Sequence, residues 1–260
     1  MSTAGAPCVP ARDDVIVVTG GGRGIGAALV GHLAALGIRV VIADVLDTES
    51  AALAERSQAE GHSVDFEHTD VACPSSTRAL AAAVLARYGR IDALINNAAI
   101  YAGIGGKKHF TDISTEEWDR VMAVNTKGAW LMTAAVFPAM KARHQGAVVN
   151  VASATVHAGV PFFAHYTASK GAVIALTRSI AKEVGREGIT VNAVAPGLVD
   201  NESSALLNES AYLPAVAGAR AIPRNMTPAD LCGAVSFLCS PASRFITGQT
   251  VIVDGGLSFT

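Results

Sequence analysis

Seven short apolar segments alternate with longer, alanine-rich segments of helical character, and this alternation limits the possible folds more than any other feature. Several short segments are apolar at all or nearly all positions, such as Val-Ile-Val-Val at 15–18 and Val-Val-Asn-Val at 148–151. Such runs are typical of strands that helices cover on both faces. We therefore expect an α/β fold with one doubly wound parallel sheet, helices on both faces and right-handed crossovers. The expected strands are 15–19, 39–43, 64–68, 93–95, 147–151, 190–195 and 250–253.

Helix signals fall between these strands. Ser114-Thr-Glu-Glu117 is a capping box ahead of a helical apolar pattern. Thr227 followed by Pro228 and Asp230 marks a second helix start. Helices are also expected over 27–36 and 165–184. Since no linker, repeat or low-complexity tract interrupts the pattern, residues 14–260 are predicted to form one domain after a flexible leader over 1–13.

Composition argues against several classes of partner. The net charge of -2, without a run of Lys or Arg, does not favour nucleic acid or an anionic membrane surface. No apolar stretch is long enough to span a bilayer, and the N-terminus lacks the features of a secretion signal. The four cysteines form no C-x-x-C pair, and no cluster has metal-ligand spacing. We therefore expect a cytoplasmic protein with free thiols and no metal.

A glycine-rich turn follows the first expected strand directly. It reads Thr19-Gly-Gly-Gly-Arg-Gly-Ile-Gly26 and runs into a helix. Glycines let the backbone approach a pyrophosphate closely, and the amides at the helix start attract its charge. Asp44 follows 18 residues after Gly26, at the end of the second strand, where an acid can bind ribose hydroxyls. The pattern predicts a dinucleotide site on a Rossmann-like sheet.

Asp44 also bears on which dinucleotide binds. A carboxylate accepts hydrogen bonds from ribose hydroxyls but repels a 2′-phosphate, and the next residue, Val45, adds no positive charge. Arg23, beside the glycine turn, is the residue that would favour NADP. NAD is the predicted cofactor, with NADP as the alternative.

Together these motifs resemble the short-chain dehydrogenase/reductase (SDR) family. The resemblance extends from Val15 to about Gly256, nearly the whole chain. The motifs that carry it are Thr19-Gly-x-x-x-Gly-Ile-Gly26, Asn96-Asn-Ala-Ala99, Asn125, Ser153, Tyr166-x-x-x-Lys170 and Pro196-Gly197.

The expected chemistry centres on Tyr166 and Lys170. They lie four positions apart on an expected helix and so share one face. A free phenol has a pKa of about 10, and we expect the ammonium and a positively charged nicotinamide to favour the phenolate. Tyr166 would then accept the alcohol proton while hydride leaves the same carbon. The resemblance implies that Ser153 binds the substrate oxygen, Lys170 the nicotinamide ribose, and Asn125 a water-linked proton relay.

The resemblance implies further cofactor contacts along the chain. Two departures stand out: Ala99 replaces a usual Gly, and Asn201 occupies a position that often holds Thr. Asn201 has the donor and acceptor to replace it. The implied cofactor-binding residues are Gly20, Gly22, Arg23, Gly24, Ile25, Gly26, Asp44, Val45, Asp70, Val71, Asn97 with its neighbour Asn96, Ala98, Ala99, Tyr166, Lys170, Pro196, Gly197, Val199 and Asn201.

Substrate contacts are expected in three irregular segments, 101–113, 153–166 and 201–224. Their composition predicts a mainly apolar pocket for a secondary alcohol or ketone with a cyclic or aromatic body. His157 is either a substrate contact or an ordinary hydrogen-bonded histidine. Lys107-Lys108-His109 is interpreted as a solvated loop rather than a site for an acidic substrate. The candidate substrate-binding residues are Ser153, His157, Phe163 and Tyr166.

The resulting hypothesis is an NAD-dependent alcohol dehydrogenase or ketone reductase. One alternative is a ketone or 3-oxoacyl reductase that uses NADP. A second is a non-catalytic dinucleotide sensor, which the joint presence of Asn125, Ser153, Tyr166 and Lys170 argues against. The resemblance also implies a homotetramer.

Overall fold

The computed structural model describes residues 6–259, except for the side chain of residue 104. Within this range seven strands form one sheet in the order β3-β2-β1-β4-β5-β6-β7, and every neighbouring pair is parallel. The strands are β1 (Val15–Thr19), β2 (Arg39–Asp44), β3 (Val64–His68), β4 (Ala93–Asn96), β5 (Gly146–Val151), β6 (Ile189–Pro196) and β7 (Thr250–Val253). The predicted fold class is confirmed, and each strand end lies within one residue of its expected position.

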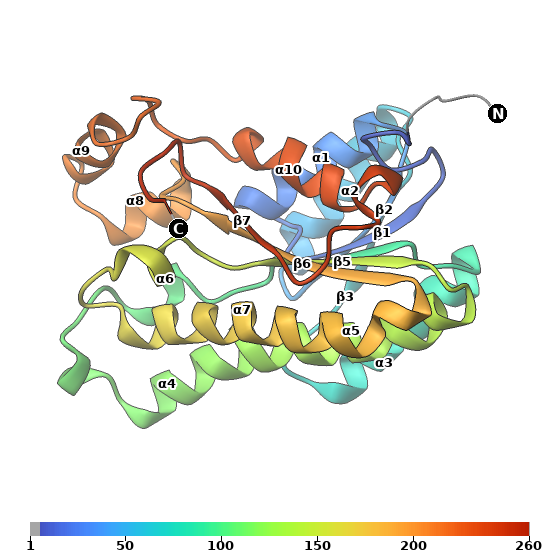
Figure 1. Ribbon diagram of the computed structural model, residues 1–260, viewed down its shortest axis with the longest axis horizontal. Helices are drawn as coiled ribbons and strands as arrows, with labels where there is room; N and C mark the ends of the chain where they lie inside the picture. Colours follow the sequence, from blue (N-terminus) through green and yellow to red (C-terminus); the bar gives the residue numbers. More distant parts are fainter. Residues whose placement is uncertain (1–5, 260) are drawn as a thin grey trace.

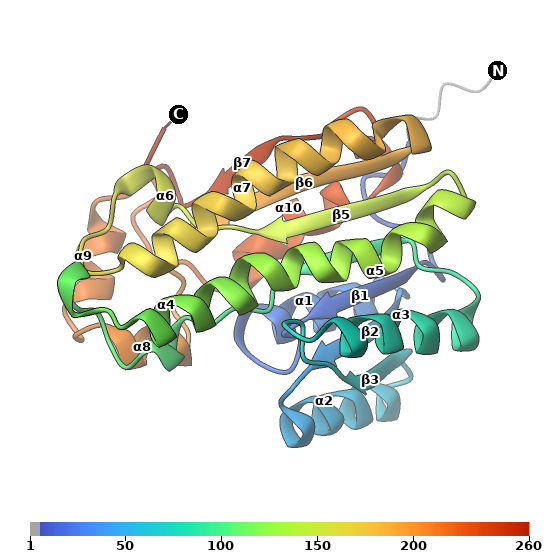
Figure 2. The same ribbon diagram turned by 90° about the horizontal axis from the view of Figure 1, so that it is seen from below.

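Helices cover both faces of this sheet (Figures 1 and 2). The helices α1 and α10 pack together on one face, and α3, α5 and α7 lie on the other. The short helices α6, α8 and α9 gather beyond the carboxyl ends of the strands. The helices are α1 (Gly24–Ala35), α2 (Asp47–Ala59), α3 (Pro74–Tyr88), α4 (Thr115–Met122), α5 (Gly128–Ala142), α6 (Thr155–Ala158), α7 (Ala164–Val184), α8 (Glu202–Leu207), α9 (Tyr212–Gly218) and α10 (Ala229–Leu238).

The strand β1 shows why its sequence is continuously apolar. Ile16 and Val18 belong to the core beneath α1 and α10, whereas Val15 and Val17 belong to the core beneath α3, α5 and α7. All four side chains are fully buried. Alternate residues of a strand point to opposite faces, so a strand covered on both sides is apolar at most of its positions.

Two helix starts differ in detail from the sequence prediction. The helix α1 begins at Gly24 rather than Ala27. Glycine is a poor helix former, yet here Gly24 and Gly26 form the first turn. At α4, Ser114 Oγ accepts the Glu117 N–H at 3.2 Å as predicted. The Glu117 carboxylate instead turns to His165 Nε2 (3.0 Å) and Lys108 Nζ (2.6 Å), so the capping box closes on one side only.

Part of the predicted leader contacts the body of the protein. The first five residues lie outside the described residues. The Ala242 N–H donates to the Pro7 carbonyl at 3.3 Å, and Asp13 forms an ion pair with Arg39 at 3.0 Å. No helix within residues 6–259 combines the length and the apolar character that a bilayer span requires.

Candidate active site

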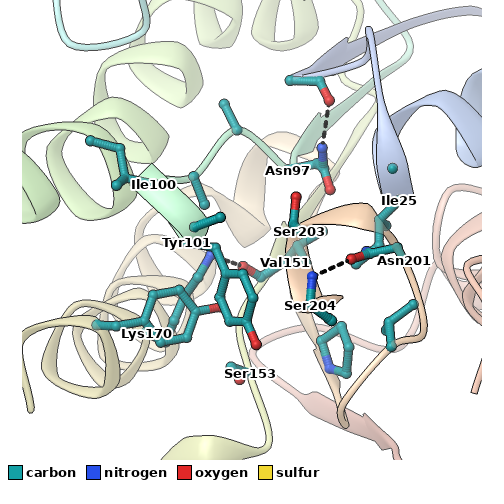
Figure 3. Close-up of a pocket in the computed structure, with 18 of the residues that line it drawn as sticks. Ile25, Asn97, Ile100, Tyr101, Val151, Ser153, Lys170, Asn201, Ser203 and Ser204 are labelled. Carbon is teal, nitrogen blue, oxygen red and sulfur yellow. Dashed lines mark hydrogen bonds between the residues drawn. The ribbon is translucent and has the colours of Figure 1, made fainter. Parts of the chain in front are cut away.

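A cavity of about 580 Å³ opens at the carboxyl ends of the central strands. Strand order reverses there, because β1 lies between β2 and β4 while the chain continues outward on both sides. Open α/β sheets bind ligands in the crevice at such a switch point. In Figure 3, Lys170, Tyr101 and Ser153 group at one end of the cavity, away from Ile25 and Asn97. These ends are called the catalytic end and the dinucleotide end below.

Two glycines of the turn, Gly20 and Gly26, pack too tightly to carry a side chain. A Cβ on Gly26 would lie 2.0 Å from the Gly20 carbonyl oxygen, and one on Gly20 would lie 2.7 Å from the Ala98 Cα. Gly20 also has a φ of +63°, which disfavours other residues. These two glycines therefore hold the start of α1 against the loop after β4.

The start of α1 points its amides toward the dinucleotide end. No side chain caps this helix, and its first turn contains no acid. Gly24 and Ile25 line the cavity. Uncapped N–H groups and the positive end of the helix dipole form a site for a phosphate anion. The residues present therefore fit the pyrophosphate of a nicotinamide dinucleotide.

Two backbone N–H groups fix the Asp44 carboxylate at the dinucleotide end. Its Oδ2 accepts the Gly22 N–H at 2.9 Å and its Oδ1 accepts the Leu46 N–H at 3.1 Å. The carboxylate is buried but lines the cavity, as do Val45 and Arg23. Each carboxylate oxygen keeps a further lone pair for a ribose hydroxyl. Gly22 itself does not line the cavity and serves to position this carboxylate.

The loop after β4 lines the dinucleotide end, but not through every predicted residue. The Asn97 amide donates to the carbonyls of Thr19 (3.0 Å) and Gly20 (2.9 Å), which ties this loop to the glycine turn. Asn96 instead donates to Asn150 Oδ1 (2.8 Å) beneath the cavity. The implied cofactor contact of Asn96 is not met, because its side chain joins β4 to β5 and does not line the cavity. The predicted residues Asp70, Val71, Asn97, Ala98 and Ala99 line the cavity.

Tyr166, Lys170 and Ser153 converge at the catalytic end. Tyr166 and Lys170 lie one turn apart on α7, and Ser153 follows β5. Lys170 Nζ donates to the Val151 carbonyl at 2.7 Å and lies 5.8 Å from the centroid of the Tyr166 ring. The Ser153 hydroxyl is hydrogen-bonded to the Thr155 hydroxyl at 3.0 Å. Two elements thus place three polar side chains around one space.

Burial opposes the charge on both members of the Tyr-Lys pair. It raises the pKa of Tyr166, and a hydrogen bond from Ser153 offsets part of this rise. Burial also lowers the pKa of Lys170 to about 8. Desolvation therefore has the largest effect on the pKa of both groups in the protein alone.

Asn125 occupies a π-helical segment, Ala123–Lys127, between α4 and α5. Its Oδ1 accepts the Ile100 N–H at 2.7 Å, and its Nδ2 donates to Ser169 Oγ at 3.0 Å. Asn125 is buried and does not line the cavity. Its contacts join the loop after β4 to α7 and do not include Lys170, so the structure supports a positioning role.

The segment after β6 forms the remaining wall, where Pro196, Gly197 and Val199 line the cavity. Asn201 Oδ1 accepts the Ser204 N–H at 2.9 Å and so caps α8 (Figure 3). A Cβ on Gly24 would lie 3.7 Å from Asn201 Nδ2. The Asn201 amide nitrogen therefore faces the start of α1, while its oxygen is engaged.

Aromatic rings surround the catalytic end. Phe163 is buried and stacks on Tyr166 with 4.5 Å between centroids. Tyr101 meets the same two rings edge-on, at 5.5 Å from Phe163 and 5.2 Å from Tyr166. The other candidate substrate residue, His157, is exposed on α6 and does not line the cavity.

The sequence predicts that the loop around Lys107 is solvated. Lys107 instead lines the cavity, so this prediction is wrong for Lys107. Its neighbour Lys108 instead pairs with Glu117 at 2.6 Å. The two adjacent lysines point to different partners, which their sequence alone does not distinguish.

Comparisons with known proteins agree with this geometry. A family model described as Enoyl-(Acyl carrier protein) reductase matches residues 20–258. Dehydrogenase/reductase SDR family member 4 of Oryctolagus cuniculus is 36% identical over 248 residues, which cover 95% of this chain and 94% of the relative. A cyclopentanol dehydrogenase of a Comamonas species is 34% identical over 246 residues, covering 94% and 97%.

A solved structure is similar over the same extent. It is that of a gluconate 5-dehydrogenase from Burkholderia cenocepacia in complex with NADP and tartrate, with a TM-score of 0.89 and 35% identity. The likeness covers 95% of this chain and 96% of the other. With the family match and the curated relatives, it shows that the chain is an oxidoreductase of the short-chain dehydrogenase/reductase family.

Proposed function

We propose that the protein interconverts a small secondary alcohol and its ketone with NAD as the hydride carrier and Tyr166 as the general acid/base. The observation that carries this proposal is the convergence of Ser153, Tyr166 and Lys170 on one cavity. That cavity also contains the uncapped start of α1 and the fixed carboxylate of Asp44.

Ser153, Tyr166 and Lys170 have different roles in the proposed alcohol oxidation. Bound NAD supplies the acceptor for the hydride that leaves the carbinol carbon. The Ser153 hydroxyl holds the substrate oxygen, and the Tyr166 phenolate, which the positive charge of bound NAD would favour, accepts the hydroxyl proton. Lys170 donates one N–H to the Val151 carbonyl and retains two for the nicotinamide ribose. In the reductive direction Tyr166 returns the proton to the ketone oxygen.

Asp44 is the basis for proposing NAD. A 2′-phosphate beside this buried carboxylate would place two negative charges in contact. Arg23 lines the same end and supports NADP as the second candidate, and the gluconate 5-dehydrogenase neighbour holds that cofactor.

The proposed substrate has an apolar body, cyclic or aromatic. Tyr101, Phe163 and Val160 line the catalytic end, and aromatic walls suit such a body. The name of the Comamonas relative, cyclopentanol dehydrogenase, supports this class. The family model's description as a reductase supports the reverse direction as a second candidate, since the same residues serve both.

The direct test is nicotinamide absorbance during turnover. Purified protein is mixed with NAD or NADP and a panel of secondary alcohols with aliphatic, cyclic or aromatic substituents. NADH formation with a cyclic or aromatic member supports the proposal. If the absorbance does not change with any of the alcohols or the matching ketones, although NADH binds measurably, the result would favour the sensor alternative.

The proposed assembly is a homotetramer. Trp130 on α5 and Phe245 near the C-terminus are exposed large hydrophobic residues that subunit contacts would cover. Light scattering in solution tests this assembly through the molar mass.

A further inference from the structure

The half-buried ammonium of Lys107 faces the catalytic end. Its Nζ lies 4.5 Å from the centroid of the Tyr212 ring and 5.9 Å from that of Phe163. Lys107, Tyr212, Phe163 and Tyr166 all line the same cavity. The catalytic end therefore contains, besides Lys170, a second ammonium group that lies beside two aromatic rings.

No carboxylate of the described chain lies within ion-pair distance of this ammonium. Its hydrogen bond runs to Asn208 Oδ1 at 2.8 Å, which engages one of its three donors. Burial lowers the pKa of Lys107, as expected for a cation that lacks a counter-charge. An uncompensated cation removed from water costs free energy, and an anionic ligand would offset this cost.

We propose that Lys107 binds a carboxylate of the substrate, so that the enzyme acts on hydroxy or oxo monocarboxylates with an apolar body. This rests on the proposed dehydrogenase function and narrows its substrate class. A single ammonium matches a single negative charge, whereas a phosphate dianion would leave excess charge among aromatic rings.

The Phe163 ring relates the two ends of such a substrate. The Phe163 centroid lies 5.9 Å from Lys107 Nζ and 4.5 Å from the Tyr166 centroid. These distances limit how far the Lys107 ammonium can lie from the Tyr166 ring. One small molecule can therefore reach both Lys107 and Tyr166, with a ring or a short apolar chain between its carboxylate and its reacting hydroxyl.

The first test measures binding without turnover. Cyclohexanecarboxylate and the neutral cyclohexanecarboxamide are titrated by calorimetry into the full-length enzyme saturated with NADH, so that the phosphate site is already filled. We expect the acid to bind the native protein about tenfold more tightly than the amide. Lys107→Gln should remove the difference, and Lys107→Arg should retain it. Lys182→Gln, at an exposed position late in α7, is the matched control.

The second test measures turnover with 3-hydroxycyclohexanecarboxylate, its carboxamide and NAD. We expect kcat/KM to favour the acid in the native protein and Lys107→Gln to reduce kcat/KM for the acid alone. Equal binding of acid and amide, binding of neither, or a preference that survives Lys107→Gln overturns the anion site. The enzyme could also bind the acid selectively and yet oxidise neither hydroxy compound nor any alcohol of the panel. That result supports the anion site but contradicts the dehydrogenase function.

Discussion

Individual side chains in this cavity are held by backbone groups. Both oxygens of Asp44 accept backbone N–H groups, and Lys170 Nζ donates to a backbone carbonyl. Such contacts fix a charged group without a neutralising partner, so the charge remains available to a ligand.

Asp44 should set the cofactor preference. In Asp44→Asn, the group facing a 2′-phosphate is neutral, so the repulsion is removed. We expect the ratio of kcat/KM for NAD to that for NADP to fall by about tenfold or more. Glu55→Gln, an exposed site on α2 with the same charge change, should leave the ratio unaltered. An unchanged ratio in Asp44→Asn would show that another residue selects the cofactor.

Burial of Lys170 should make stability depend on pH. Its pKa is about 8 in the folded protein, against an ordinary value of 10.5. Between these values the unfolded chain binds more protons, so the free energy of unfolding rises with pH. The gain approaches about 3 kcal/mol. Urea unfolding from pH 7.5 to 10.5 should show this rise in the native protein relative to Lys170→Met. Parallel curves for the two proteins would contradict it.

At the scale of elements, the sequence predicted strands better than the local irregularities that shape the site. Strands buried on both faces are apolar at most of their positions, and this pattern is visible without a structure. The sequence predicts the start of α1 three residues late, because Gly26 serves close packing and Gly24 has a φ of +57°, and helix propensity reveals neither. The π-helical segment around Asn125 and the different partners of Lys107 and Lys108 depend on contacts with distant elements. No local pattern distinguishes them.

Two glycines of α1 provide a matched test of this element. A Cβ on Gly26 meets the Gly20 carbonyl oxygen at 2.0 Å, whereas one on Gly31 has no neighbour within 4 Å. Gly26→Ala should therefore weaken NADH binding by about tenfold or more, measured by fluorescence titration. Gly31→Ala should bind NADH normally and unfold at a higher temperature, gaining about 0.5–1 kcal/mol from helix propensity. Equal effects of the two changes would refute the close-packing account.

At the scale of the whole molecule, the topology of the sheet brings the residues of the site together. Parallel strands place their carboxyl ends at one edge, so motifs as distant as Asp44, Ser153 and Pro196 line one cavity. The order of motifs along the sequence predicted this gathering. The orientation of residues outside regular elements could not be predicted in this way. His157 lies outside the cavity and Lys107 within it, because the path of each segment depends on packing against α7, α8 and α9.

The central claim is that Tyr166 transfers the substrate proton, and Tyr166→Phe tests it most directly. The ring stacks on Phe163, so the variant keeps the aromatic packing and loses only the hydroxyl. NADH affinity and the rate of NAD reduction should be measured on the same preparation, with an alcohol that the native enzyme oxidises. The account predicts unchanged NADH binding and a turnover rate that is lower by about 10²–10⁴-fold or more. A rate within a few-fold of the native value would contradict it and assign the proton transfer to another group.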